Sequence, residues 1–103
     1  MAQTYHLFKS PRMDKKYAIV LPNGNRIDFG AKGYSDYTKH KDPERKQRYI
    51  TRHALNEDHS PRGIETAGFW ARWLLWNKPT IAASIRDIEK NFRIKILYHK
   101  YSR

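Results

Sequence analysis

GIETAGFWARWLLWNKPT, residues 63–80, is the stretch that decides the fold, because it contains all 3 tryptophans of the 103-residue chain. No other segment has comparable apolar mass, so we expect the core to form around it. Thr66 can cap a helix that ends near Trp76, and the large apolar side chains of this helix then cover an arc of about 160°. They are Phe69, Trp70, Trp73, Leu74 and Trp76. We expect core rather than a ligand platform, with the edge of Trp70 or Trp76 reaching the surface.

A second helix packs on the first in this interpretation. Residues 77–79 end the tryptophan helix, because a proline disfavours helical geometry at the residue before it, and Thr80 can cap a new helix to about Asn91. The apolar residues of this helix form a narrow stripe at helical spacing, namely Ile81, Ile85, Ile88 and Phe92. Strict alternation over residues 93–96 then predicts a C-terminal strand.

Residues 17–30 predict a β-hairpin. Strand-forming residues at 17–21 and alternating residues at 26–30 flank Pro22-Asn23-Gly24-Asn25, and an Asn-Gly pair tolerates the positive φ angles of a tight turn. Residues 3–10 alternate loosely, which fits either an edge strand or an extended arm. The predicted fold class is α+β: a small antiparallel sheet, made of the hairpin and a C-terminal strand over 93–98, packed on about three helices, with extended basic termini.

The length fits a single domain with one small core. We divide the chain into an extended N-terminal arm (1–16), one α+β domain (17–97) and a basic C-terminal tail (98–103). The expected core consists of Ile19, Leu21, Ile27, Phe29, Phe69, Trp73, Leu74, Ile81, Ile85, Ile88, Phe92, Ile94 and Ile96.

Charge indicates the class of partner. The chain has 21 Lys and Arg against 10 Asp and Glu, a formal net charge of +11. A net charge so far from zero attracts polyanions, so nucleic acid, an acidic protein surface or an anionic membrane surface are the expected partners. The absence of cysteine excludes disulfides and cysteine-based zinc sites. The sequence has no apolar run long enough to span a bilayer, and residues 1–6 do not resemble a signal peptide, so we expect a protein that is not secreted.

A helix over residues 43–56 carries the strongest functional signal. Asp42 can cap it, Pro43 suits its first position, and Arg45, Arg48 and Arg52 fall on one side of it without an acidic neighbour in the stripe. Guanidinium groups at helical spacing present forked donors to phosphates or carboxylates. Further cations lie nearby, at Lys39, Lys41 and Lys46. The alternative is an ordinary solvated helix face.

The two ends of the chain carry the second signal, because aromatic and basic residues are interleaved there. They are Tyr5, Phe8, Lys9 and Arg12 near the N-terminus and Tyr98, Lys100, Tyr101 and Arg103 near the C-terminus. Such residues can stack on bases and neutralise phosphates, or lie along grooves of a neighbouring protein. Frayed tails are the alternative.

Catalytic, metal and cofactor sites are not expected. The candidate set of polar residues comprises Asp36, His40, Asp42, His53, Asp58 and His59, and its spacings match no zinc-binding helix signature. His53 shares the apolar face of its helix with Tyr49, which favours a satisfied core histidine over a metal ligand. Residues 30–42 are expected to be an ordered loop, in which Tyr34 and Tyr37 should pack, because tyrosine rings are costly to leave in water.

Three blocks of the sequence resemble a known family. The first block is LPNG at residues 21–24, followed by IDFG at residues 27–30. The second is SDYTKHKDP at residues 35–43, followed by Arg45-Lys46 and Tyr49. The third runs from TAGFW to LLWNKPT over residues 66–80. Together they resemble small, basic, uncharacterised proteins of large nucleocytoplasmic DNA viruses, over roughly residues 15–92. The resemblance implies a virion or a viral factory as the setting, and it implies no catalytic or binding residues.

Two functional hypotheses follow. The first is a non-enzymatic structural component of a virus particle, a minor capsid protein that bridges the acidic surfaces of its neighbours within a larger assembly. The alternative is a sequence-independent nucleic-acid-binding protein for genome packaging or condensation, which would contact the backbone of DNA or RNA. Both hypotheses use the same arginines.

Overall fold

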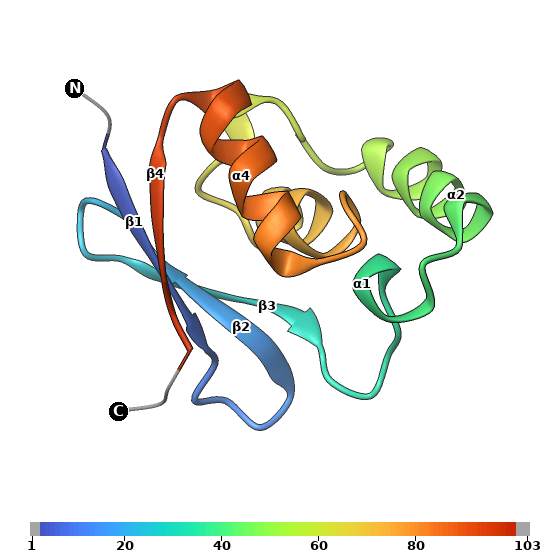
Figure 1. The fold of residues 1–103 in the computed structure, drawn as a ribbon, viewed down its shortest axis with the longest axis horizontal. Helices are drawn as coiled ribbons and strands as arrows, with labels where there is room; N and C mark the ends of the chain where they lie inside the picture. Colours follow the sequence, from blue (N-terminus) through green and yellow to red (C-terminus); the bar gives the residue numbers. More distant parts are fainter. Residues whose placement is uncertain (1–2, 101–103) are drawn as a thin grey trace.

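A four-stranded sheet forms one side of the molecule, as seen in the computed structural model, which describes residues 3–100 (Figure 1). The strands are β1 (Thr4–Lys9), β2 (Lys15–Val20), β3 (Arg26–Ala31) and β4 (Lys95–His99), in the order β3-β2-β1-β4. β2 pairs antiparallel with both β1 and β3, and β4 pairs parallel with β1. The α+β class is therefore confirmed, but the sheet is mixed rather than antiparallel.

β1 is the main difference from the sequence prediction. Residues 4–9 form neither an arm nor an edge strand, because they lie between β2 and β4, and the C-terminal strand pairs with them rather than with the hairpin. Tyr5 and Leu7 point into the core and are 5% and 0% exposed. Polar and apolar residues alternate only loosely along this strand, because its other face carries both a polar residue, His6, and an apolar one, Phe8. Both are half-buried. The predicted boundary between the N-terminal arm and the α+β domain, at residue 16, therefore lies within the sheet.

The hairpin matches its prediction closely. β2 and β3 are paired from Lys15↔Ala31 to Val20↔Arg26. The turn contains Gly24 at φ 91°, a conformation that L side chains rarely adopt, and the amide of Gly24 donates to the carbonyl of Leu21 (2.9 Å). Gly24 alone provides the positive φ that this turn needs, since Asn23 does not adopt one.

The tryptophan stretch forms the centre of the core. Thr66 caps α3 (Ala67–Trp70), which continues as a π-helical turn over Ala71–Leu75. Trp70 is 0% exposed, and its Nε1 donates to the carbonyl of Ile64 (2.7 Å), so the expectation of a surface edge is wrong for Trp70. Trp76, at the end of the π turn, is half-buried. A short 3₁₀ helix over Pro61–Gly63 precedes this segment.

The second predicted helix is α4 (Ile81–Phe92), and Thr80 caps it through the amide of Ala83 (3.1 Å). Ile88 is fully buried, and the other apolar residues of its stripe pack partly buried against the core. All thirteen predicted core residues are in or against the hydrophobic cluster. Five further apolar residues are buried that were not among the predicted core residues, namely Tyr5, Leu7, Ala18, Trp70 and Leu75.

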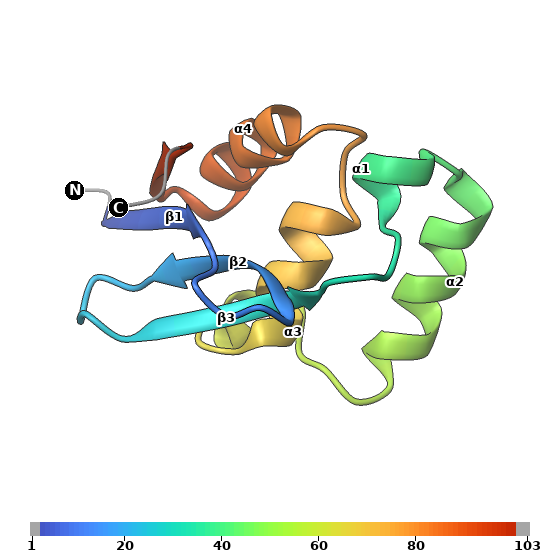
Figure 2. The same cartoon turned by 90° about the horizontal axis from the view of Figure 1, so that it is seen from below.

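The remaining helices lie at one end of the molecule. The predicted loop 30–42 contains a short helix, α1 (Tyr37–His40), which the side chain of Asp36 caps. α2 (Pro43–Ala54) follows, capped by Asp42, and this helix, described over its whole length, has no buried residue. Figures 1 and 2 both place α2 at the end of the molecule far from β4. Within residues 3–100, no helix is long and apolar enough to cross a membrane.

Candidate polyanion-binding site

The arginine face of α2 borders an open cleft of about 650 Å³, which we call the arginine cleft. Arg45, Arg48 and Arg52 line one wall, and Lys15 and the segment from Gly30 to Asp36 contribute to the other. Tyr49, His53 and Trp76 also line the cleft, and so do Glu57 and Leu75. The predicted arginine stripe is therefore gathered at a concave surface rather than at a flat helix face.

The three arginines of the cleft have no ion-pair partner in the described chain, whereas the two carboxylates of the cleft are engaged. Arg45, Arg48 and Arg52 are exposed, and none of the three forms an ion pair with another described residue. Asp36 pairs with Lys16, and Glu57 contacts two histidines. Because three arginines without an ion pair outnumber these two engaged carboxylates, the cleft attracts anions.

Asp36 anchors the loop that forms the far wall. Its side chain is almost fully buried and accepts from the Lys16 ammonium (2.5 Å) and from the Thr38 amide (2.9 Å). Lys16 also donates to the backbone carbonyl of Tyr34 (2.6 Å). A buried carboxylate with these partners is satisfied, so the contact fixes the loop rather than repelling a bound anion.

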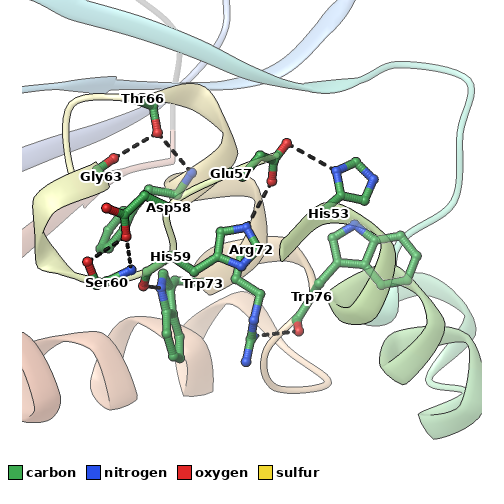
Figure 3. Close-up of polar contacts among 11 residues, drawn as sticks. His53, Glu57, Asp58, His59, Ser60, Gly63, Thr66, Arg72, Trp73 and Trp76 are labelled. Carbon is green, nitrogen blue, oxygen red and sulfur yellow. Dashed lines mark hydrogen bonds and ion pairs between the residues drawn. The ribbon is translucent and has the colours of Figure 1, made fainter. Parts of the chain in front are cut away.

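Glu57 forms a clasp between the end of α2 and the rest of the molecule (Figure 3). Its carboxylate lies 3.0 Å from Nδ1 of His53 and 2.8 Å from Nε2 of His59. Burial raises the pKa of Glu57, but the hydrogen bonds from His59 and His53 outweigh it and hold the pKa below its ordinary value. Gly68 leaves room for this carboxylate, because a Cβ there would lie 2.6 Å from Glu57 Cδ.

A stack of three rings makes the second attachment of α2. Tyr49 lies 4.0 Å from the ring of His53 and 4.2 Å from the ring of Trp76, with interplanar angles of 22° and 4°. Burial raises the pKa of Tyr49, so the phenol stays neutral. Beside the stack, Arg72 lies over the ring of Trp73 (4.2 Å) and donates to the carbonyl of Trp76 (3.0 Å). His53 is therefore a structural histidine, although it is half-exposed rather than a core residue.

The other predicted cations around α2 have different positions. Lys39 is exposed and lines a neighbouring groove together with Lys9. Lys41 donates to the carbonyl of Thr38 (2.9 Å), and Lys46 lies 5.1 Å from the centre of the Tyr37 ring. Burial, with the charges of Arg72 and Lys78, lowers the pKa of Lys46. Lys41 and Lys46 do not line the arginine cleft.

The predicted residues at the ends of the chain do not form one site. Tyr5 is a core residue, and Tyr98 is half-buried against the core, so neither ring is free to stack on a ligand. Phe8 stacks on His99 (4.4 Å) on the opposite face of the sheet, and Arg12 pairs with Asp14 (3.0 Å). Lys100 is exposed. Tyr101 and Arg103 lie outside the described residues.

The histidine–aspartate set is dispersed over structural roles. Asp42 caps α2, and Asp58 accepts from the amide of Ser60 (2.9 Å). Nδ1 of His40 accepts from the amide of Asp42 (2.9 Å), whereas its buried Nε2 has no partner within the described chain. Burial, together with the charge of Arg45, lowers the pKa of His40. No three His, Asp or Glu side chains within residues 3–100 are placed to bind a metal ion.

Three residues of the far wall were not predicted as site residues, namely Lys15, Lys16 and Tyr34. No local pattern in the sequence relates Lys15 and Lys16 to α2. Tyr34 was expected to pack, but its side chain is 74% exposed. The sequence signal for a turn at this point is Gly33, which precedes Tyr34 and adopts φ 91° in the structure.

Comparison with known proteins extends this picture only slightly. Residues 5–53 match a family of unknown function (DUF5754). The matched region runs from β1 to the last turn of α2, so it includes the three arginines and excludes the tryptophan stretch. No curated protein and no solved structure matches the chain. The chain is thus similar to that family over a little less than half its length, in the part that forms the hairpin and the arginine helix.

Proposed function

We propose that this protein is a non-enzymatic, sequence-independent nucleic-acid-binding protein that binds the phosphate backbone in the arginine cleft. One observation carries the proposal: three exposed arginines without ion-pair partners in the described chain line one wall of a cleft whose two carboxylates are each held by neighbouring side chains. Contacts of this kind to phosphates are independent of base sequence.

The spacing of the arginines suits a chain of anions. A helix rises about 1.5 Å per residue, so the Cα atoms of Arg45 and Arg52 lie about 10 Å apart along the axis of α2. Three guanidinium groups over that length can contact successive phosphates of one strand, each with a forked pair of donors. The concave form of the site favours a narrow polyanion over a broad protein surface.

A structural component that bridges acidic protein surfaces in a virus particle is the second candidate. It is favoured by a shallow groove of about 350 Å³ on the outer side of α2, lined by Gln47, Arg48, Thr51, Arg52 and Leu55. Leu55 is 82% exposed, and an apolar side chain between arginines is typical of a protein contact. Here the arginines would meet carboxylates instead of phosphates.

Binding of fluorescent oligonucleotides by the purified protein tests the proposal. The triple variant Arg45→Ala, Arg48→Ala, Arg52→Ala is expected to lose about tenfold or more in affinity at moderate salt, because each lost phosphate contact removes a counterion-release contribution. The matched control removes the same charge elsewhere, through Arg62→Ala, Arg86→Ala and Lys90→Ala, all at exposed positions.

Equal losses for the two triple variants would contradict the proposal, because the effect would then reflect net charge alone. Polyglutamate serves as the second probe. Binding to polyglutamate without binding to oligonucleotides would favour the bridging component over the nucleic-acid-binding protein.

A further inference from the structure

We infer that the ligand is single-stranded nucleic acid, which continues from the arginine cleft across the Tyr34 loop into a second basic groove and stacks a base on the ring of Tyr34. The inference rests on the proposed function and assigns its substrate class. It needs three features: a second groove, an exposed ring between the two depressions, and cations on both sides of that ring.

The second groove has a volume of about 510 Å³ and shares four lining residues with the arginine cleft, namely Lys16, Tyr34, Ser35 and Asp36. Besides Lys16, which is paired with Asp36, it has three cations. They are Lys9, Lys32 and Lys39, which come from the end of β1, the loop after β3 and the last turn of α1. All three are exposed, and none forms an ion pair within residues 3–100. The basic surface is therefore continuous from α2 to the end of β1.

Tyr34 lies at the junction of the two depressions. Its side chain is 74% exposed, although its backbone is fixed, because its carbonyl accepts from Lys16 (2.6 Å) and its amide donates to Ala31 (3.4 Å). By contrast, the nearby Tyr37 is half-buried, and its ring contacts the ring of His40 and the ammonium group of Lys46. A ring that is exposed on an ordered backbone can receive a base at little entropic cost.

A single strand fits this arrangement better than a duplex. The bases of a duplex are stacked on one another, whereas an unpaired base offers a free face to an aromatic side chain. The phosphates on either side of a base stacked on Tyr34 would meet the arginines in one direction and the lysines of the second groove in the other. Asp36, beneath the loop, does not oppose this path, because its charge is compensated by Lys16.

Three probes separate stacking from charge: a single-stranded oligonucleotide, a duplex of the same length, and inorganic polyphosphate, which has no bases. Tyr34→Ala is expected to weaken binding of the single strand about tenfold and to leave the other two affinities unchanged. Tyr34→Phe should retain wild-type affinity, because it keeps the ring. Met13→Ala, at an exposed apolar position that lines neither groove, is the matched control and should have no such selective effect.

The results distinguish this inference from the proposed function. If Tyr34→Ala leaves the single-strand affinity unchanged, or lowers all three affinities equally, the stacking inference is wrong even where the arginine triple variant still abolishes binding. If the wild-type protein binds neither oligonucleotide, the proposed function is wrong as well. A separate triple variant tests the second groove, namely Lys9→Ala, Lys32→Ala and Lys39→Ala. This variant should lower the affinity for the single-stranded oligonucleotide more than the control variant at Arg62, Arg86 and Lys90 does.

Discussion

The body of the protein, which we define as the sheet with α3, the π turn and α4, contrasts with the arginine helix α2. The body buries two large rings completely, since Phe69 and Trp70 are both 0% exposed. α2, which is described throughout, has no buried residue and is attached by the ring stack and the Glu57 clasp. The residues that stabilise the fold and the arginines that can bind a ligand therefore lie in different regions of the molecule. Because the three arginines stay hydrated on α2, they impose no desolvation cost on the core.

Truncating the core should have the largest effect. Trp70→Ala removes a fully buried indole together with its hydrogen bond to Ile64, and such substitutions cost about 3–5 kcal/mol of unfolding free energy. Urea denaturation followed by far-UV circular dichroism measures the loss. A cost below about 1 kcal/mol would show that the tryptophan stretch is not the centre of the core.

Removing the central ring of the stack should release α2 while the body stays folded. Tyr49→Ala deletes contacts with both His53 and Trp76, each of a kind worth about 1 kcal/mol. Hydrogen exchange should then show lost protection for the amides of α2, with the amides of β1 and β2 unchanged. Tyr49→Phe keeps the stack and is the control. Equal loss of protection in α2 and in the sheet would mean that the two regions unfold as one unit.

The glycine under the clasp offers a milder perturbation of the same attachment. In Gly68→Ala the new Cβ would displace the Glu57 carboxylate from its two histidines, at a cost of about 1 kcal/mol. In a Glu57→Ala background the same substitution should cost much less, because nothing is left to displace. A double-mutant cycle of urea midpoints measures this coupling. Additive effects would contradict a direct contact between these two positions.

The smallest expected effect is a pH dependence at the junction of the two regions. Burial and the charge of Arg45 lower the pKa of His40, so the unfolded chain binds a proton more readily than the folded one. The contribution of His40 to stability is therefore complete above its ordinary pKa of about 6.5 and is lost as the pH falls below that value. His40→Gln should reduce the fall of the urea midpoint between about pH 7 and pH 5.5. An unchanged pH dependence would exclude His40 as a contributor.

The two regions also differ in how well the sequence predicts them. The caps at Asp42, Thr66 and Thr80 and the Asn23-Gly24 turn are local signals, and all of them are confirmed. The position of β1 could not be predicted, because strand order depends on contacts with residues 95–99, far away in the sequence.

The arginine stripe could likewise be read from helical spacing, but the cleft could not. Its far wall comes from Lys15, Lys16 and Tyr34, whose positions depend on the buried pair of Lys16 with Asp36. No periodicity encodes such a pair. For the same reason, the separate basic signals of Lys9 and Lys39 gave no indication that both line one groove.

The most direct test of the account is the salt dependence of single-strand binding. For single strands, the slope of log affinity against log salt is about −0.7 for each phosphate neutralised. Removing Arg45, Arg48 and Arg52 should therefore make the slope shallower by about 2 if each contacts one phosphate, while the urea midpoint stays that of the wild type. An unchanged slope, or a change equal to that of the Arg62, Arg86 and Lys90 control, would contradict the account.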